Sequence, residues 1–274
     1  MNSIAIVGAG GQAIAHATCL KMESWEVNIY NRNDNYRSKA IDSGFDIKDI
    51  KDGIKENLIY LLVGDDVHGI VYDKYIKPYE TNNTTIIVAH AYSYYSKNFN
   101  PSKEISVGMI APRMPGSPII KAKESGTGVP AFWDVMQGDY DTVKNIIMLI
   151  ANDIGYSKSY FKKVPWSEEC EVDLFIEQYF LPRLIVLIEQ TFEYLTEIGF
   201  QNETALYELF QSGELGMLLT EASRVGLLET WIRNASPTCR YGLNESILKL
   251  RDEVDEQNLM KSALEGIRNG SFFE

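Results

Sequence analysis

Residues 4–13 read Ile-Ala-Ile-Val-Gly-Ala-Gly-Gly-Gln-Ala, an apolar run that passes directly into a glycine-rich turn. β-branched residues dominate the run, which predicts a strand, and the apolar spacing of residues 14–20 predicts a helix behind the turn. Gly8, Gly10 and Ala13 fit the pattern G-x-G-x-x-A in that context. The stretch therefore predicts the strand, turn and helix with which a dinucleotide-binding fold begins.

Further apolar runs of strand length follow, separated by mixed or helical segments. They cover residues 26–30, 59–63, 85–89, 105–110 and 128–135. This alternation predicts an α/β fold with a parallel, doubly wound sheet, the Rossmann arrangement.

The pattern changes near residue 140. From Thr142 onward the apolar period is close to 3.6, which predicts an all-helical second half with helices at residues 143–154, 168–198, 203–220 and 247–269. We place the domain boundary there: a nucleotide-binding domain in residues 1–140 and an all-α domain for metal, substrate and dimerisation in residues 141–274.

The charge balance narrows the classes of partner. The chain carries 38 acidic and 26 basic side chains, a net charge of −12, which argues against nucleic acid and acidic membranes because both require clustered Lys and Arg. The most apolar stretch, residues 180–188, is interrupted by Pro182 and Arg183 and is too short to span a bilayer. With no basic, apolar leader at Met1, the sequence predicts a cytoplasmic protein.

The glycine turn supplies most of the predicted cofactor site. Gly8 permits the tight turn, Gly10 lets the backbone approach a pyrophosphate, and Ala13 allows close packing of helix on strand. Gly11 and Gln12 complete the turn. The alternative reading is a glycine turn that only joins strand to helix.

The end of the second strand predicts which nucleotide is bound. An NAD enzyme usually has Asp or Glu there, whereas residues 30–33 read Tyr-Asn-Arg-Asn. A guanidinium suits a 2′-phosphate, so NADP(H) is favoured over NAD. Because Asp34 follows directly and is acidic, NAD remains the alternative cofactor. The predicted contacts at this position are Asn31, Arg32 and Ser38.

Residues 167–178 carry a run of carboxylates. Asp173 and Glu177 are spaced to share one helix face among apolar neighbours, where buried negative charge needs compensation. Oxygen ligands favour Mg²⁺ or Mn²⁺ over zinc. The remaining carboxylates of the run are expected on a solvated face: Glu168, Glu169 and Glu171.

Histidines are scarce, with three in the chain. His90 follows a predicted strand, where it could relay a proton or orient a metal-bound water; the alternative is a packed imidazole. His16 and His68 are expected to be structural.

Several segments together resemble ketol-acid reductoisomerase, the Mg²⁺- and NADPH-dependent family of branched-chain amino-acid synthesis. The similar segments are residues 8–17, 64–78, 88–90, 111–116, 126–130, 168–178 and 267–272. The most specific is 168–178, with the family's Glu-Glu-X-Glu-X-Asp-Leu-Phe-X-Glu-Gln pattern. The resemblance implies a Rossmann domain followed by a knotted helical domain, in a homodimer whose subunits complete each other's active sites.

Roles follow from the resemblance, residue by residue. Asp173 and Glu177 would be metal ligands, and Glu208 would be a third ligand donated across the dimer. Ser236 would hold the substrate carboxylate. The family has a second glutamate one helical turn after the position of Glu208. This chain has Ser212 there, so one metal position should be weakened or lost. The implied catalytic residues are His90, Arg113 and Glu177, of which Arg113 replaces the family's lysine and would receive a substrate carboxylate or oxyanion.

The sequence thus predicts an NADPH-dependent, Mg²⁺-assisted oxidoreductase acting on a small 2-hydroxy-3-oxo or 2-oxo acid, with or without alkyl migration. One alternative is an NAD(P)-dependent dehydrogenase or oxidoisomerase of a branched sugar acid. The other is a non-catalytic NADP-binding dimer.

Overall fold

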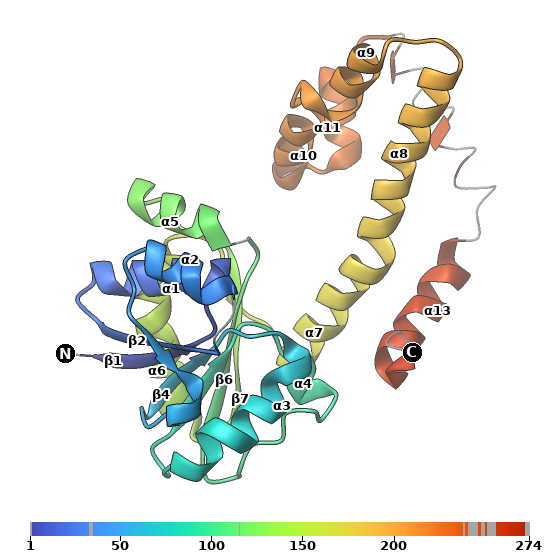
Figure 1. Ribbon diagram of the computed structural model, residues 1–274. Coiled ribbons are helices and arrows are strands. Elements are labelled where there is room, and N and C mark those ends of the chain that lie inside the picture. The colour runs from blue at the N-terminus through green and yellow to red at the C-terminus, as the bar shows by residue number, and fades with distance from the viewer. Residues whose placement is uncertain are drawn as a thin grey trace. The chain divides into compact units, whose positions relative to one another are not determined.

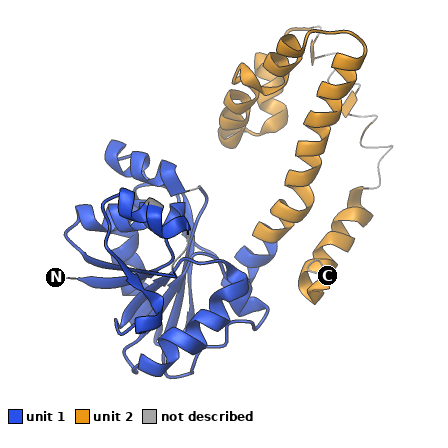
Figure 2. Ribbon diagram, viewed as in Figure 1, with its two compact units in different colours: residues 1–172 blue, residues 173–274 orange. Residues whose placement is uncertain are grey.

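The computed structural model describes residues 2–32, 35–114, 116–237, 239–240, 246–247, 250 and 256–271, with the side chain of Lys39 left out. The chain divides into two compact units, Met1–Val172 and Asp173–Glu274 (Figure 2). Among the described residues, none of the helices has both the length and the apolar character that a membrane crossing requires.

The first unit is built on an eight-stranded sheet with the order β3-β2-β1-β4-β5-β6-β7-β8 (Figure 1). Neighbouring strands are parallel except β6 and β7, which are antiparallel. The strands are β1 (Ser3–Val7), β2 (Glu26–Asn31), β3 (Ile47–Asp49), β4 (Leu58–Leu61), β5 (Thr85–Val88), β6 (Ser106–Pro112), β7 (Ala131–Gln137) and β8 (Phe161–Lys163). The predicted α/β class is confirmed. The strands that the sequence pattern did not predict, β3 and β8, have three residues each, too few to show a period.

Helices cover the sheet on both faces. They are α1 (Gly11–Met22), α2 (Asn35–Asp42), α3 (His68–Val71), α4 (Tyr92–Tyr95), α5 (Gly116–Ser125) and α6 (Tyr140–Ile154). Ile4 and Ile6 of β1 belong to a fully buried core with residues of α1, α5 and α6, while α3 and α4 lie on the other side of the sheet (Figure 1). Burial on both faces explains why these strands are almost continuously apolar.

The unit boundary lies between Val172 and Asp173, later than the predicted boundary at residue 140. α6 has helical periodicity, but its apolar face, with Val143 and Ile147 fully buried, packs on β6 and β7 of the sheet. β8 then pairs with β7 and extends the sheet further. The prediction of an all-helical second half was therefore wrong for β8.

The described residues of the second unit form helices and the turns that join them. α7 (Trp166–Phe175) runs across the division and continues through a π-helical turn, Ile176–Phe180, into α8 (Leu181–Glu197). The other helices are α9 (Asn202–Leu206), which continues into a second π-helical turn at Tyr207–Gln211, α10 (Glu214–Val225), α11 (Leu227–Asn234) and α13 (Glu256–Asn269).

α8 exposes apolar side chains along its length. None of its residues is buried, and Ile185, Leu187 and Tyr194 are 55%, 63% and 62% exposed. Side chains of this size are seldom left together in water by a stable monomer.

His16 of α1 is the centre of a buried polar network. Its Nδ1–H donates to the carbonyl of Gln12 at 2.6 Å, and its Nε2 accepts from the Tyr156 hydroxyl at 2.6 Å. The Tyr60 hydroxyl lies 3.4 Å from the same Nε2. Burial lowers the pKa of His16 from 6.5 to about 4, because the charged form would be desolvated. The expected structural role of His16 is confirmed, and it is the neutral imidazole that fits this network.

This depressed pKa predicts an acid-sensitive fold. Above about pH 6.5 both folded and unfolded chains hold a neutral His16; between about pH 6.5 and 4 only the unfolded chain takes up the proton, so the free energy of unfolding falls by about 3 kcal/mol. Urea unfolding at about pH 7 and about pH 4.5 measures the effect. The native protein should lose about 2 kcal/mol more than His16→Gln between these conditions. Equal losses would contradict the assignment.

Candidate active site

The glycine turn lies at the carboxyl end of β1, where the strand order reverses between β1 and β4. Gly8 has φ +118°, and a Cβ built on it would lie 2.2 Å from the carbonyl oxygen of Leu62. The Gly8 N–H donates to the carbonyl of Tyr30 at 2.8 Å. Gly8 is therefore enclosed by the backbones of both neighbouring strand ends, and a side chain has no room there.

The outer side of the same turn is open. A Cβ added at Gly10 or Gly11 would meet no atom within 4 Å, and α1 begins at Gly11 without a side-chain cap. The first N–H groups of a helix have no partner within the helix, and the helix dipole favours an anion at this end. Ala13 is fully buried, which lets α1 pack close to the sheet. The turn thus fits a dinucleotide pyrophosphate.

Gly116, at the start of α5, is part of this turn's surroundings and was missed as a site residue. A Cβ on it would lie 2.4 Å from the carbonyl oxygen of Gly11. The start of α5 therefore packs directly against the glycine turn. Its sequence signal was weak: Gly116 stands at the start of a helix, and its backbone conformation does not require glycine.

Two of the residues predicted to select the nucleotide, Asn31 and Arg32, lie at the end of β2, beside β1, and the third, Ser38, lies in α2. Asn31 is buried, whereas Arg32 and Ser38 are exposed. Asp34 lies outside the described residues. The exposure of Arg32 and Ser38 is compatible with a 2′-phosphate contact, which remains a proposal.

His90 lies just beyond β5 at the same edge of the sheet. Its Nδ1 is 3.1 Å from Oδ2 of Asp65, a residue that begins a 3₁₀ turn after β4. The ring stacks on Tyr92, with the centroids 6.5 Å apart. Asp65 had no role in the predicted site, because nothing in its local sequence shows that it faces His90.

Arg113 and Glu169 form an ion pair at the end of β6. The Arg113 Nη2 donates to Glu169 Oε1 at 2.6 Å, and their side chains are 26% and 0% exposed. The guanidinium carbon lies 5.2 Å from the Phe132 ring centre. The prediction of a solvated face for Glu169 was wrong, because this face of α7 is covered and Arg113 compensates the buried carboxylate.

His90, Glu169 and Asp173 form a group of side chains that could hold a metal ion. One ligand atom from each lies within 4.8 Å of the others. The division between the units falls inside α7, so the helix that carries Glu169 also positions Asp173 one turn later. The ligand group predicted from sequence contained Asp173 but neither His90 nor Glu169.

The other predicted ligands lie elsewhere. Glu177 and Glu208 are exposed and do not belong to this group. Each lies in a π-helical turn, Ile176–Phe180 or Tyr207–Gln211, and π turns occur frequently at functional sites. A π turn was the structural signal that the sequence period did not show.

Ser212 and Ser236 are exposed as well. The Ser236 hydroxyl accepts a hydrogen bond from the N–H of Cys239 at 3.3 Å. Its predicted contact with a substrate carboxylate stays a proposal.

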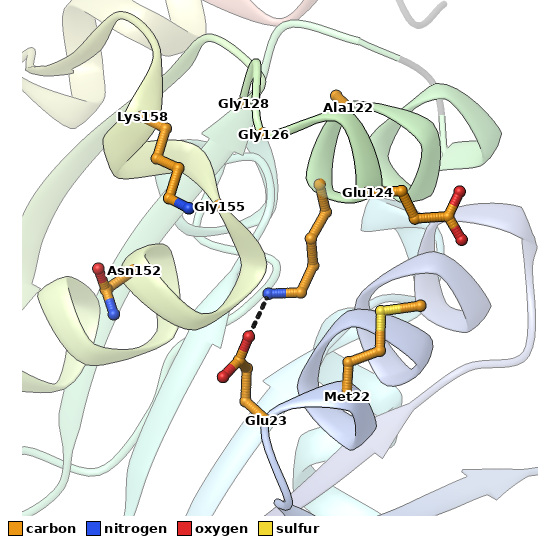
Figure 3. Close-up of a pocket in the computed structure, with 10 residues that line it drawn as sticks. Met22, Glu23, Ala122, Glu124, Gly126, Gly128, Asn152, Gly155 and Lys158 are labelled. Atoms are coloured by element: carbon orange, nitrogen blue, oxygen red, sulfur yellow. Dashed lines mark hydrogen bonds and ion pairs between the residues drawn. The ribbon is translucent and has the colours of Figure 1, made fainter.

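A pocket of about 440 Å³ lies at the opposite end of α1 from the glycine turn, lined by Met22, Glu23, Lys123 and Lys158 among others (Figure 3). Lys123 Nζ donates to Glu23 Oε1 at 2.8 Å and to the carbonyl of Asp153 at 2.5 Å. Lys123 therefore joins the ends of α1, α5 and α6, and we assign this pocket no part in the active site.

The fold and this edge of the sheet define the class of protein. A Rossmann-type sheet with a glycine turn at its switch point, and ionisable side chains after β5 and β6, is the arrangement of a nicotinamide-dinucleotide oxidoreductase. Residues 1–159 match the family model "Acetohydroxy acid isomeroreductase, NADPH-binding domain", and residues 166–274 match "Ketol-acid reductoisomerase, C-terminal domain". The chain belongs to the ketol-acid reductoisomerase family, and its nucleotide cofactor is NADP(H).

Individual relatives are similar to this chain over nearly its whole length. The ketol-acid reductoisomerase (NADP(+)) of Methanocaldococcus jannaschii is 32% identical over 99% of this chain and 82% of its own length. The structure of an NADH-preferring ketol-acid reductoisomerase from an uncultured archean is 26% identical, with a TM-score of 0.87 over 99% of this chain and 83% of that one. A semialdehyde dehydrogenase NAD-binding protein from Cupriavidus necator shares the fold at 15% identity, with a TM-score of 0.71 over 98% and 99% of the two chains.

Proposed function

We propose that the protein uses NADPH and a divalent cation to reduce a small 2-hydroxy-3-oxo or 2-oxo acid, in the manner of a ketol-acid reductoisomerase. The observation that carries this proposal is the group of His90, Glu169 and Asp173 at the sheet edge that also holds the glycine turn. Ligands of such sheets bind outside the carboxyl ends of the strands. Nicotinamide and substrate would meet there.

A magnesium ion fits the donors that this chain offers. Asp173 would supply an oxygen ligand beside His90, and Glu177 lies in the turn that follows α7. A bound Mg²⁺ would polarise the substrate's carbonyl and hydroxyl oxygens. His90 would hold or move the substrate proton. Arg113, which pairs with Glu169 beyond the end of β6, would attract a substrate carboxylate or oxyanion through its positive charge.

We also propose a homodimer with shared active sites. The apolar side chains exposed along α8 support it, because a second copy would bury them. Glu208 and Ser236 would then serve the site of the other copy. With Ser212 in place of the family's carboxylate, one of two metal positions would bind weakly.

The pair of substrates that differ by one rearrangement tests the proposal. We expect Mg²⁺-dependent oxidation of NADPH with 2-acetolactate and with its rearranged isomer, 3-hydroxy-3-methyl-2-oxobutanoate, and slower oxidation of NADH. Turnover of the isomer alone would show that reduction is retained and alkyl migration lost, as the weak metal position at Ser212 would cause.

Asp173→Asn and Glu168→Gln make a matched pair on α7. Asp173→Asn should lower kcat at least roughly 100-fold, because a neutral amide oxygen binds a divalent cation more weakly than a carboxylate does. Glu168 is exposed on the same helix, so Glu168→Gln should leave kcat unchanged. Turnover only of branched sugar acids with NADP⁺ would favour the oxidoisomerase. Cofactor binding without any turnover, unaffected by Asp173→Asn, would favour a non-catalytic binding protein.

A further inference from the structure

Asp65 lies between two histidines, and this position gives it a role. Its Oδ2 is 3.1 Å from Nδ1 of His90, and its Oδ1 is 3.7 Å from Nδ1 of His68. Asp65 follows β4 and His90 follows β5, and these strands are parallel neighbours. Their carboxyl ends therefore place the two side chains together.

His68 fixes the turn that carries Asp65. Its Nε2 is 3.0 Å from the carbonyl of Val63, which can only accept, so Nε2 carries the proton. Its Nδ1 then accepts from the Ser93 hydroxyl at 2.7 Å. The ring is 2% exposed, and burial lowers the pKa of His68, so it stays neutral. His68 thus joins the turn after β4 to α4, the helix that follows His90. This link fixes the position of Asp65 relative to His90.

The Asp65 carboxylate decides which nitrogen of His90 carries the proton. An ionised carboxylate only accepts, so Nδ1–H of His90 donates to it. Nε2 then presents its lone pair. The choice of tautomer matters because Glu169 and Asp173 also lie close to His90, and their carboxylates compete with Asp65 for its N–H. Arg113 bonds Glu169 and so weakens that competing attraction.

We propose that Asp65 is a positioning residue that holds His90 in the Nδ1–H tautomer and thereby makes Nε2 the atom available to a divalent cation or a substrate proton. A carboxylate behind a histidine fixes the ring orientation and tautomer in many metal sites. The assignment of the tautomer rests on the hydrogen bonds alone; its consequence for turnover rests on the proposed function.

Imidazole nitrogen NMR tests the tautomer directly. We expect ¹⁵N-histidine spectra at one neutral pH to show His90, identified by its loss in His90→Gln, with Nδ1 protonated and Nε2 not. In Asp65→Asn the negative charge beside Nδ1 is gone, so the proton should move to Nε2. A native His90 that carries its proton on Nε2 or on both nitrogens would overturn the proposal, as would a tautomer unchanged by Asp65→Asn.

Mn²⁺ binding gives a second readout that needs no turnover. Asp65→Asn should weaken Mn²⁺ affinity roughly 10- to 100-fold, the usual effect of removing such a partner. Asp66→Asn is the matched control, because Asp66 is exposed on the same turn, and it should change neither readout. Asp65→Glu keeps a carboxylate and should recover the Nδ1–H tautomer, which separates positioning from folding. Equal Mn²⁺ affinities in the native protein and Asp65→Asn would overturn the part of the proposal that concerns the cation.

The two proposals can fail separately. If the tautomer changes in Asp65→Asn but the native protein reduces neither keto acid, Asp65 positions His90 and the proposed function is wrong. If the native protein turns over and Asp65→Asn lowers neither kcat nor the Nδ1–H population, the function stands and Asp65 has no positioning role.

Discussion

Gly8→Ala is expected to remove high-affinity NADPH binding and to lower the free energy of unfolding by on the order of 4 kcal/mol. A Cβ at this position would lie 2.2 Å from the carbonyl oxygen of Leu62, so β4 or the turn must move. The φ of +118° adds strain that alanine cannot relieve. If the start of α1 binds the cofactor as proposed, any displacement of the turn also distorts the pyrophosphate site. Urea unfolding and titration with NADPH measure the two effects.

Gly44→Ala is the control that separates backbone strain at a positive φ from the steric clash with Leu62. Gly44 also has a positive φ, +80°, but a Cβ there would meet no atom within 4 Å. It should cost only about 1 to 2 kcal/mol and leave NADPH affinity unchanged. If both variants lowered the free energy of unfolding equally, the clash with Leu62 would make no contribution to the loss. If Gly8→Ala bound NADPH with native affinity, the turn would not be the nucleotide site.

Arg113→Met has the second largest expected effect, because it removes the cation beside a fully buried carboxylate. Removing one partner of a buried ion pair costs about 3 to 5 kcal/mol. Because the Arg113 side chain is 26% exposed, we expect a loss of about 3 kcal/mol, at the lower end of this range. The stability of Arg113→Met should respond more strongly to Mn²⁺ than that of the native protein, because a cation can replace the guanidinium. Thermal unfolding with and without Mn²⁺ measures this difference.

The double variant Arg113→Met/Glu169→Gln is the control. An amide carries no charge to leave uncompensated, so the second change should recover most of the lost stability. Additive losses in the double variant would mean that the 2.6 Å contact contributes no coupling, and that Arg113 acts through its packing on Phe132.

The sequence predicted the fold well where a short local pattern suffices. The strand, turn and helix of residues 4–20, the later strands and the helical periods are all local, so the α/β class followed from them. The family followed from the resemblance of short motifs, above all residues 168–178. The domain boundary did not, because α6 is periodic whether it packs on a sheet or in a bundle. Its attachment to β6 and β7 depends on contacts between distant residues.

The candidate site divides in the same way. Asp173 and His90 could be singled out from residue type and position alone, since a carboxylate among apolar residues and a histidine after a strand are unusual. The burial of Glu169, its pairing with Arg113 and the bond from His90 to Asp65 join different strand ends, and no local pattern encodes them. The sequence by itself determined the nucleotide-binding fold and the family. The tertiary structure decided which ionisable groups face one another, because the free energy of a buried charge depends on the partners that folding brings within a few ångströms.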